Sequence, residues 1–156
     1  MKKRIKFITS FFYLGHSPFM PGTMGSLGGL IVYFLVKDHD LLYGFSILFL
    51  FFLGVLFAGE AEKIYKHKDA KMIVIDEACG ILLALFFVPY SMLSVILGFF
   101  IFRILDILKP PPAKKVEKLT GSLGVMFDDV IADIYKNLIL QVIFRIYNLP
   151  LCFLGK

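Results

Sequence analysis

Long runs without charged residues are the strongest constraint on the fold of this 156-residue chain. Residues 41–59 and 78–102 contain no charged side chain, and residues 138–154 contain Arg145 as their only one. A membrane-spanning helix needs about 20 apolar residues, so these runs are of the right length. The hydrophobic content of 58% also exceeds the roughly 45 to 50% that is typical of soluble proteins. The sequence therefore predicts an integral membrane protein.

The expected fold is all-α, in a single domain that covers residues 1–156. Period-two alternation, the signal of a strand, is missing. A shorter apolar run, residues 24–36, is expected to tilt or to pack against other helices. The basic and apolar segment at residues 1–15 resembles a signal peptide but lacks a small-residue cleavage site, so we expect an uncleaved interfacial helix.

Pro89 leaves two arrangements open for residues 78–102. A single helix of this length could cross the bilayer, and it would carry the polar segments before and after it to opposite faces. Because proline interrupts a helix, the "VPYS" stretch favours a hairpin of two short, re-entrant helices. The hairpin keeps both flanking polar segments on one face.

Three polar segments, residues 1–26, 60–77 and 103–136, contain most of the Lys and Arg residues. The positive-inside rule places such segments in the cytoplasm, so we expect all three on the cytoplasmic face. The basic residues are scattered among carboxylates and form no stripe with stacking aromatics, which argues against a nucleic-acid partner. An anionic lipid surface is the expected partner.

Two adjacent acidic pairs border the apolar runs: Asp76 with Glu77, and Asp128 with Asp129. Neighbouring carboxylates repel each other and are costly at the edge of hydrocarbon unless a cation neutralises them. Carboxylate oxygens suit Mg²⁺, so both pairs are candidate metal ligands and catalytic residues. Asp133 follows Asp129 by four residues and shares its helix face. It is interpreted either as a neighbour of the ligands or as an exposed residue.

Arg103, Asp106 and Lys109 follow one another at three-residue steps, which places them on one helix face. Arginine forms bidentate contacts with phosphate oxygens and lysine supplies a point charge. The face therefore predicts a phosphate clamp, with Asp106 as a further candidate metal ligand. The structural alternative is that the basic side chains reach out to anionic headgroups.

A stretch rich in glycine, "GHSPFMPGTMGSLGGL", opens the shorter apolar run. Such a turn before a helix can present backbone N–H groups to an anion, and Thr23 or Ser26 would add a hydroxyl. Small residues also let membrane helices pack closely, which is the structural alternative. His16 is interpreted as a loop residue, with a role as proton donor left open.

These parts together argue for hydrolysis or transfer of a phosphate on a lipid. The chain resembles the phosphatidylglycerophosphatase A family in "GHSPFMPGTMGSLGGL", "IVIDEACG", "FRILDILKPPP" and "GSLGVMFDDVIAD", which occur in the family order. The resemblance implies a Mg²⁺-dependent, multi-pass enzyme of the bacterial inner membrane whose active site faces the cytoplasm. Such an enzyme removes the terminal phosphate of phosphatidylglycerophosphate to give phosphatidylglycerol.

The resemblance also implies the members of the site, including one more acidic residue, Glu60, as a metal ligand. It leaves open whether water attacks the phosphate directly or an aspartyl phosphate forms. Asp133 departs from the family, which usually has glycine at that position. The site residues that the resemblance implies are Gly22, Thr23, Asp76, Glu77, Arg103, Asp106, Lys109, Asp128 and Asp129.

Two other functions compete with this hypothesis. A CDP-alcohol-type lipid phosphotransferase also gathers aspartates around a metal, but "DDVIADIYKN" lacks the Asp-Gly step and downstream Ala-Arg of that class. A non-enzymatic, cation-binding transporter subunit would place its carboxylates at mid-membrane depth. Here the carboxylates are expected at helix ends, beside Lys and Arg.

Overall fold

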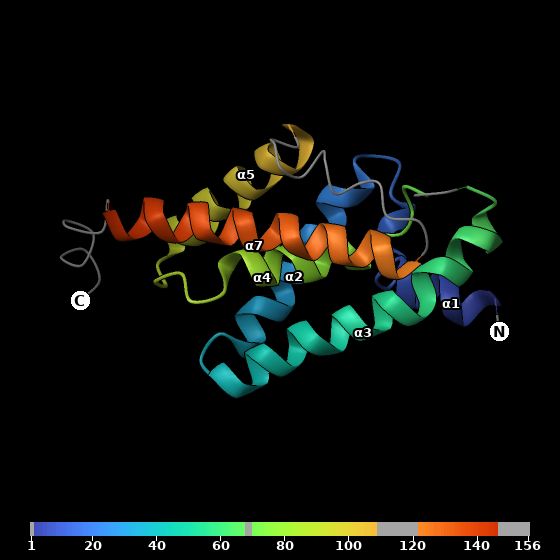
Figure 1. Cartoon of the computed structure of the whole chain (residues 1–156), viewed down its shortest axis with the longest axis horizontal. Helices are drawn as coiled ribbons and strands as arrows, with labels where there is room; N and C mark the ends of the chain where they lie inside the picture. The colour runs from blue at the N-terminus through green and yellow to red at the C-terminus, as the bar shows by residue number, and fades with distance from the viewer. Residues whose placement is uncertain (1, 68–69, 109–121, 147–156) are drawn as a thin grey trace.

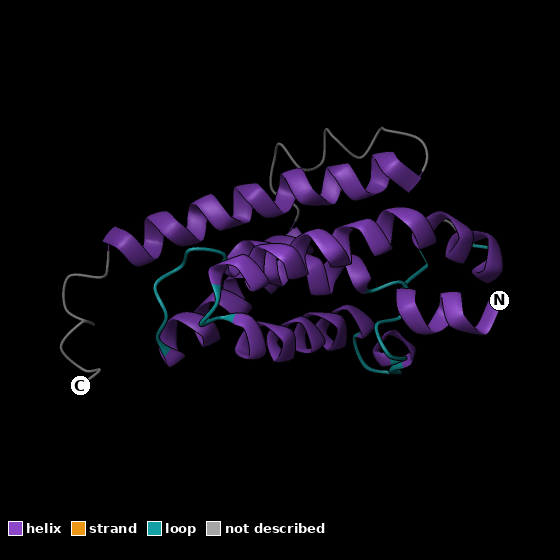
Figure 2. Ribbon diagram, turned by 90° about the horizontal axis from the view of Figure 1, so that it is seen from below, coloured by secondary structure: helices purple, strands orange, loops and turns teal. Residues whose placement is uncertain are grey.

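The computed structural model describes residues 2–67, 70–108 and 122–146, and over these residues it is entirely helical (Figures 1 and 2). This confirms the all-α prediction. No strand occurs in the described ranges. The elements are α1 (Lys2–Thr9), the short 3₁₀ helix η1 (Leu14–His16), α2 (Pro21–Val36), α3 (Asp40–Tyr65), α4 (Ile75–Leu85), α5 (Met92–Leu108) and α7 (Ser122–Ile146).

Within the described part of the chain, α3 is the one helix long and apolar enough to cross a membrane. Only 22% of its most apolar window is buried inside the fold, and large side chains such as Phe45, Phe52 and Leu56 are exposed. The core helix of a soluble protein would bury such residues. The surface of α3 is therefore that of a helix facing lipid.

Residues 78–102 form parts of two helices that run in opposite directions. α4 ends at Leu85, α5 begins at Met92, and the turn between them contains Pro89. The end of α5 returns to the start of α4, where Arg103 lies 3.8 Å from Glu77. Of the two arrangements that the sequence left open, the structure has the hairpin.

The backbone carbonyls at the C-terminal end of α4 accept hydrogen bonds from side chains of two other helices. Asn137 on α7 donates from Nδ2 to the carbonyl oxygens of Leu83, Ala84 and Phe86 at 3.0, 2.9 and 2.8 Å. The Tyr43 hydroxyl on α3 donates to a further α4 carbonyl at 2.7 Å. The last carbonyls of a helix have no partner within it, and apolar surroundings supply no water. These bonds therefore allow α4 to end inside the fold.

The small residues of α2 let this helix pack directly against α4 (Figure 1). A Cβ atom at Gly29 would meet the carbonyl oxygen of Ala78 at 2.6 Å, so a larger residue would separate the helices. On α4, the neighbouring residues Ile81 and Leu82 are completely buried. The packing role considered for the glycine-rich stretch is thus observed along α2.

The polar ends of several elements meet at one end of the molecule. The amide of Val74, just before α4, donates to the carbonyl of Thr9 at the end of α1, at 2.9 Å. At the end of α3, the Tyr65 hydroxyl lies 3.3 Å from Nε2 of the exposed His16. This end carries the candidate site. Its orientation toward the cytoplasm stays a prediction.

Candidate active site

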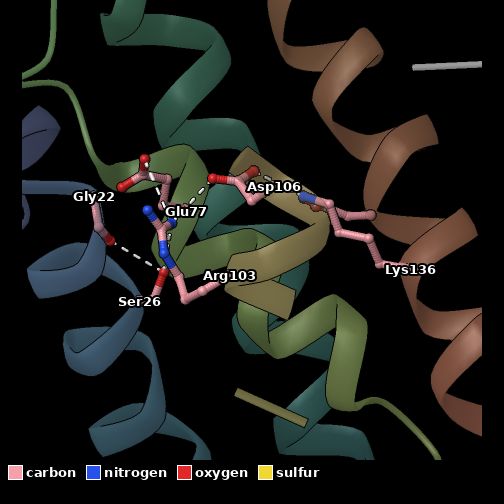
Figure 3. Close-up of polar contacts among 7 residues, drawn as sticks. Gly22, Ser26, Glu77, Arg103, Asp106 and Lys136 are labelled. Atoms are coloured by element: carbon pink, nitrogen blue, oxygen red, sulfur yellow. Dashed lines mark hydrogen bonds and ion pairs between the residues drawn. The ribbon is translucent and has the colours of Figure 1, made fainter. Parts of the chain in front are cut away.

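Five charged residues of alternating sign join α4, α5 and α7, and we call them the charged cluster (Figure 3). Arg103 Nη1 lies 3.8 Å from Oε1 of Glu77 and 3.0 Å from Oδ2 of Asp106. Lys136 Nζ lies 2.9 Å from Oδ1 of Asp106 and 2.8 Å from Oδ1 of Asp133. The cluster thus connects the three helices through ion pairs between their side chains.

The charged cluster is most deeply buried at α7. The side chains of Lys136 and Asp133 are 8% and 7% exposed, whereas Asp106 keeps 28% of its surface. Burying a charge is costly unless it is paired and hydrogen-bonded, and here each cation has at least two acidic neighbours. The more accessible part, around Glu77 and Asp106, is the side from which a ligand can approach.

The start of α2 lies beside this accessible part. Ser26 is buried, donates its hydroxyl to the carbonyl of Gly22 at 3.1 Å and accepts a hydrogen bond from Arg103 Nη1 at 3.4 Å. The Glu77 carboxylate lies against Gly22, where a Cβ atom would overlap with it. Two of the candidate phosphate-binding residues of α2, Gly22 and Ser26, are therefore in contact with the charged cluster.

Two buried donors on this side make no hydrogen bond within the described residues: the Thr23 hydroxyl and Nε of Arg103. Buried polar groups nearly always have a partner, and leaving one unsatisfied costs about 1 to 3 kcal/mol. Both groups carry a hydrogen to donate. Each could donate a hydrogen bond to an acceptor-rich ligand, such as a phosphate group.

Asp133 and Lys136 form a buried ion pair. Burial raises the pKa of Asp133 to about 6, against the opposing effect of the Lys136 ammonium. Burial lowers the pKa of Lys136, but Asp133 and Asp106 outweigh it and the net pKa is raised. The two side chains thus stabilise each other's charged form against the cost of burial. The interpretation of Asp133 as an exposed residue is wrong, because its carboxylate packs against Gly80 of α4.

Comparison with known proteins supplies the family. The sequence model of phosphatidylglycerophosphatase A matches residues 7–144. The chain belongs to this family. Membership confirms the resemblance seen in the sequence and the prediction of a lipid phosphatase.

Three relatives illustrate the similarity. Proteins named phosphatidylglycerophosphatase A from Escherichia coli and Haemophilus influenzae are each 34% identical, over 132 residues (83% of this chain, 77% of the relative) and 130 residues (79% and 78%). A Bacteroides thetaiotaomicron protein provisionally named phosphatidylinositol-3-phosphatase is 36% identical over 137 residues (82% and 86%). No solved structure matches the chain significantly.

The remaining residues expected from the phosphatidylglycerophosphatase A family fall in three groups. Asp76 is partly buried on α4 beside Glu77. Glu60 is exposed on α3, and in the described ranges no hydrogen bond or ion pair joins it to the charged cluster. Lys109 lies outside the described residues, as do the side chains of Asp128 and Asp129, whose backbone belongs to α7.

Sequence reasoning missed Lys136, the cation that connects Asp106 to Asp133. The signal was present, because Asp133 and Lys136 are three residues apart and therefore neighbours on a helix. Asp133 was interpreted only from its spacing to Asp129. Nothing in the sequence pattern indicates that α7 would place this pair against α5.

The described residues supply oxygen ligands of the kind that Mg²⁺ prefers. Glu77 and Asp106 offer carboxylate oxygens, which suit this hard cation. Over the described ranges, however, no three His, Cys, Asp or Glu side chains form a group that could hold a metal ion. A complete ligand set would need carboxylates beyond these, such as Asp128 and Asp129. Dependence on Mg²⁺ stays a prediction.

Proposed function

We propose that this chain hydrolyses phosphatidylglycerophosphate to phosphatidylglycerol and inorganic phosphate, in keeping with the names of two of its relatives. The observation that supports this most is the position of the unsatisfied donors of Thr23 and Arg103 beside the charged cluster. A phosphomonoester is a dianion with several strong acceptors. Such a group can accept a hydrogen bond from either donor.

Arg103 is the residue that binds the phosphate in this proposal. Its guanidinium contacts Glu77, Asp106 and Ser26 through Nη1, which fixes its position before the substrate arrives. The guanidinium presents donors in a planar fork that matches phosphate oxygens. Stabilising the charge that develops on these oxygens is the main way such an enzyme lowers the barrier. Thr23 donates one further hydrogen bond.

Mg²⁺, when bound, neutralises phosphate charge and favours attack by an oxygen nucleophile. The residues of this chain that would hold it are Glu77 and Asp106, with Asp76, Asp128 and Asp129 as further candidates. One carboxylate acts either as the base that activates water or as a nucleophile that forms an aspartyl phosphate. Incorporation of solvent ¹⁸O into a carboxylate during a single turnover would identify the covalent route.

We place the chain in the bacterial inner membrane as a multi-pass protein, with the charged cluster facing the cytoplasm. The exposed apolar surface of α3 supports a membrane location. Lys63 is exposed near the polar end of α3. A Lys63→Cys variant should react with an impermeant thiol reagent only when the cytoplasmic face is open, and labelling from the outside would contradict this orientation.

The direct test is phosphate release by the purified chain in mixed micelles of detergent and lipid. Phosphatidylglycerophosphate and phosphatidylinositol 3-phosphate are compared at equal surface concentration, because one relative is provisionally named for the second type of lipid. We expect release from phosphatidylglycerophosphate to be the faster reaction. Faster release from the inositol lipid would reassign the substrate, and no release from either would contradict a phosphatase.

The rival functions have their own signatures in the same preparation. A lipid phosphotransferase would consume a nucleotide-activated lipid without releasing phosphate. A transporter subunit would support cation flux into liposomes and release no phosphate. Membership of the phosphatidylglycerophosphatase A family favours the hydrolase over both.

A further inference from the structure

We propose that Lys136 is a positioning residue of the active site, which acts through Asp106 on Arg103, and that Asp133 holds Lys136 in place. The inference rests on the proposed function, because it concerns how Arg103 is oriented for a phosphate. Through Lys136 and Asp133, α7 contributes to the site.

Asp106 is the link between the two cations. Its Oδ2 accepts from Arg103 at 3.0 Å, and its Oδ1 accepts from Lys136 at 2.9 Å. A carboxylate is planar, so fixing one oxygen fixes the direction of the other. Figure 3 shows Asp106 between the two basic side chains, which come from α5 and α7. Lys136 therefore sets the orientation in which Asp106 meets Arg103.

Lys136 is itself held from three sides. Its Nζ lies 2.9 Å from Asp106, 2.8 Å from Asp133 and 4.4 Å from the centroid of the Phe102 ring. A lysine at the surface samples many rotamers, but this side chain is 8% exposed and has two carboxylates and an aromatic face around it. These contacts restrict its motion. Its contribution is to hold Asp106.

Asp133 completes the arrangement from the far side of Lys136. Its Oδ1 accepts from the ammonium, and its other oxygen lies against Gly80 of α4. Because Gly80 has no side chain, the carboxylate fits between α4 and α7. The pair thus lies in the interface between α4 and α7. Asp133 therefore determines the position from which the Lys136 ammonium contacts Asp106.

The competing explanation is purely structural: Lys136 neutralises the buried Asp133 and does nothing else. The variant Lys136→Met/Asp133→Asn separates the two explanations. It removes both charges of the pair, so no unpaired buried charge remains there, while Oδ1 of Asp106 loses its cation. A second variant, Lys136→Gln/Asp133→Asn, keeps polar groups in the interface in case the first one folds poorly.

The experiment measures kcat and KM for phosphate release from phosphatidylglycerophosphate, together with thermal unfolding. We expect the double variant to unfold near the wild-type temperature while kcat falls roughly 10- to 100-fold, as for other small displacements of a reacting group. The matched control is Lys37→Met/Asp38→Asn, which removes a Lys–Asp pair at the opposite end of α2 and should leave kcat unchanged.

A combination with Asp106→Asn tests the route of the effect. If Lys136 acts through Asp106, adding Lys136→Met/Asp133→Asn to Asp106→Asn lowers kcat by less than about threefold, because the link is already lost. A full, independent loss on that background would overturn the proposal.

The remaining outcomes separate this inference from the proposed function. Wild-type kcat in both double variants would show that Lys136 only neutralises Asp133, and would overturn the inference while leaving the phosphatase intact. Absence of phosphate release by the unmodified chain would overturn the proposed function and, with it, the role of Lys136.

Discussion

The carboxylate of Glu77 rests against the backbone of Gly22, so that the first turn of α2 meets the first turn of α4 with no side chain from Gly22 between them (Figure 3). Glu77 in turn lies 3.8 Å from Arg103. Gly22 therefore determines how close α2 can come to the charged cluster. This is a packing role at the site, in addition to the phosphate contact expected from the sequence.

Gly22→Ala should displace Glu77 and lower kcat by roughly 10-fold or more, because a small shift of a site residue has a large effect on rate. Gly44→Ala is the matched control, since a Cβ atom at Gly44 meets nothing within 4 Å. That change should leave kcat unaltered and stabilise α3 by up to about 1 kcal/mol. Equal kcat values for both variants would show that the Gly22 contact is unimportant for catalysis.

Thr23→Val should raise KM several-fold without lowering stability. The Thr23 hydroxyl is buried and has no partner within the described residues, so its removal loses a bond only when substrate is present. Thr9→Val is the control, for which we expect lower stability and an unchanged KM. The Thr9 hydroxyl donates to the Ile5 carbonyl at 2.8 Å, and its loss should lower the free energy of unfolding by about 1 kcal/mol with KM unchanged.

Steady-state kinetics and denaturant unfolding of the two threonine variants check this prediction. A Thr23→Val protein that loses stability but keeps its KM would assign the hydroxyl to the fold and not to substrate binding.

Asn137→Leu should destabilise the protein by about 1 to 3 kcal/mol, because it removes the side-chain donor that the carbonyls of Leu83, Ala84 and Phe86 share at the end of α4. The control is Ser46→Ala, which removes a hydroxyl bond to the Leu42 carbonyl from an exposed position and should change stability little. Denaturant unfolding in detergent gives the comparison. An Asn137→Leu variant as stable as Ser46→Ala would show that α4 does not need these bonds.

Chelation of divalent cations should abolish phosphate release, and added Mg²⁺ should restore it. Asp76→Asn and Asp129→Asn should each lower activity sharply and raise the Mg²⁺ concentration needed for half-maximal rate, because each removes a candidate oxygen ligand. Full phosphate release in the presence of a chelator would contradict the hypothesis that the reaction depends on a metal ion. It would not affect the assignment of Arg103.

The hairpin could be predicted because its signals are local. Pro89 divides an apolar run whose halves are too short to span a bilayer, and the polar segments on both sides favour one face. The donors of Asn137 and Tyr43 that allow α4 to end inside the fold could not be predicted. They depend on which helices pack around α4, and this is not encoded in local spacing.

In the site, too, contacts within one helix could be predicted and contacts between helices could not. Arg103 and Asp106 were found from their spacing on one helix, and they do form an ion pair at 3.0 Å. Lys136 was missed because its partner Asp106 is on another helix. Glu60 was included from the family resemblance, yet it is exposed on α3 and is not joined to the charged cluster in the described ranges. Contacts between helices were thus the part that spacing could not supply.

The most direct test of the central claim, that Arg103 binds the phosphate of a lipid substrate, compares Arg103→Met with Arg145→Met. Arg145 is exposed in the last turn of α7, so its loss removes the same charge away from the site. Phosphate release from phosphatidylglycerophosphate should fall by at least roughly 100-fold in Arg103→Met and stay near wild type in Arg145→Met. Wild-type release by a folded Arg103→Met protein would contradict the assignment of the active site.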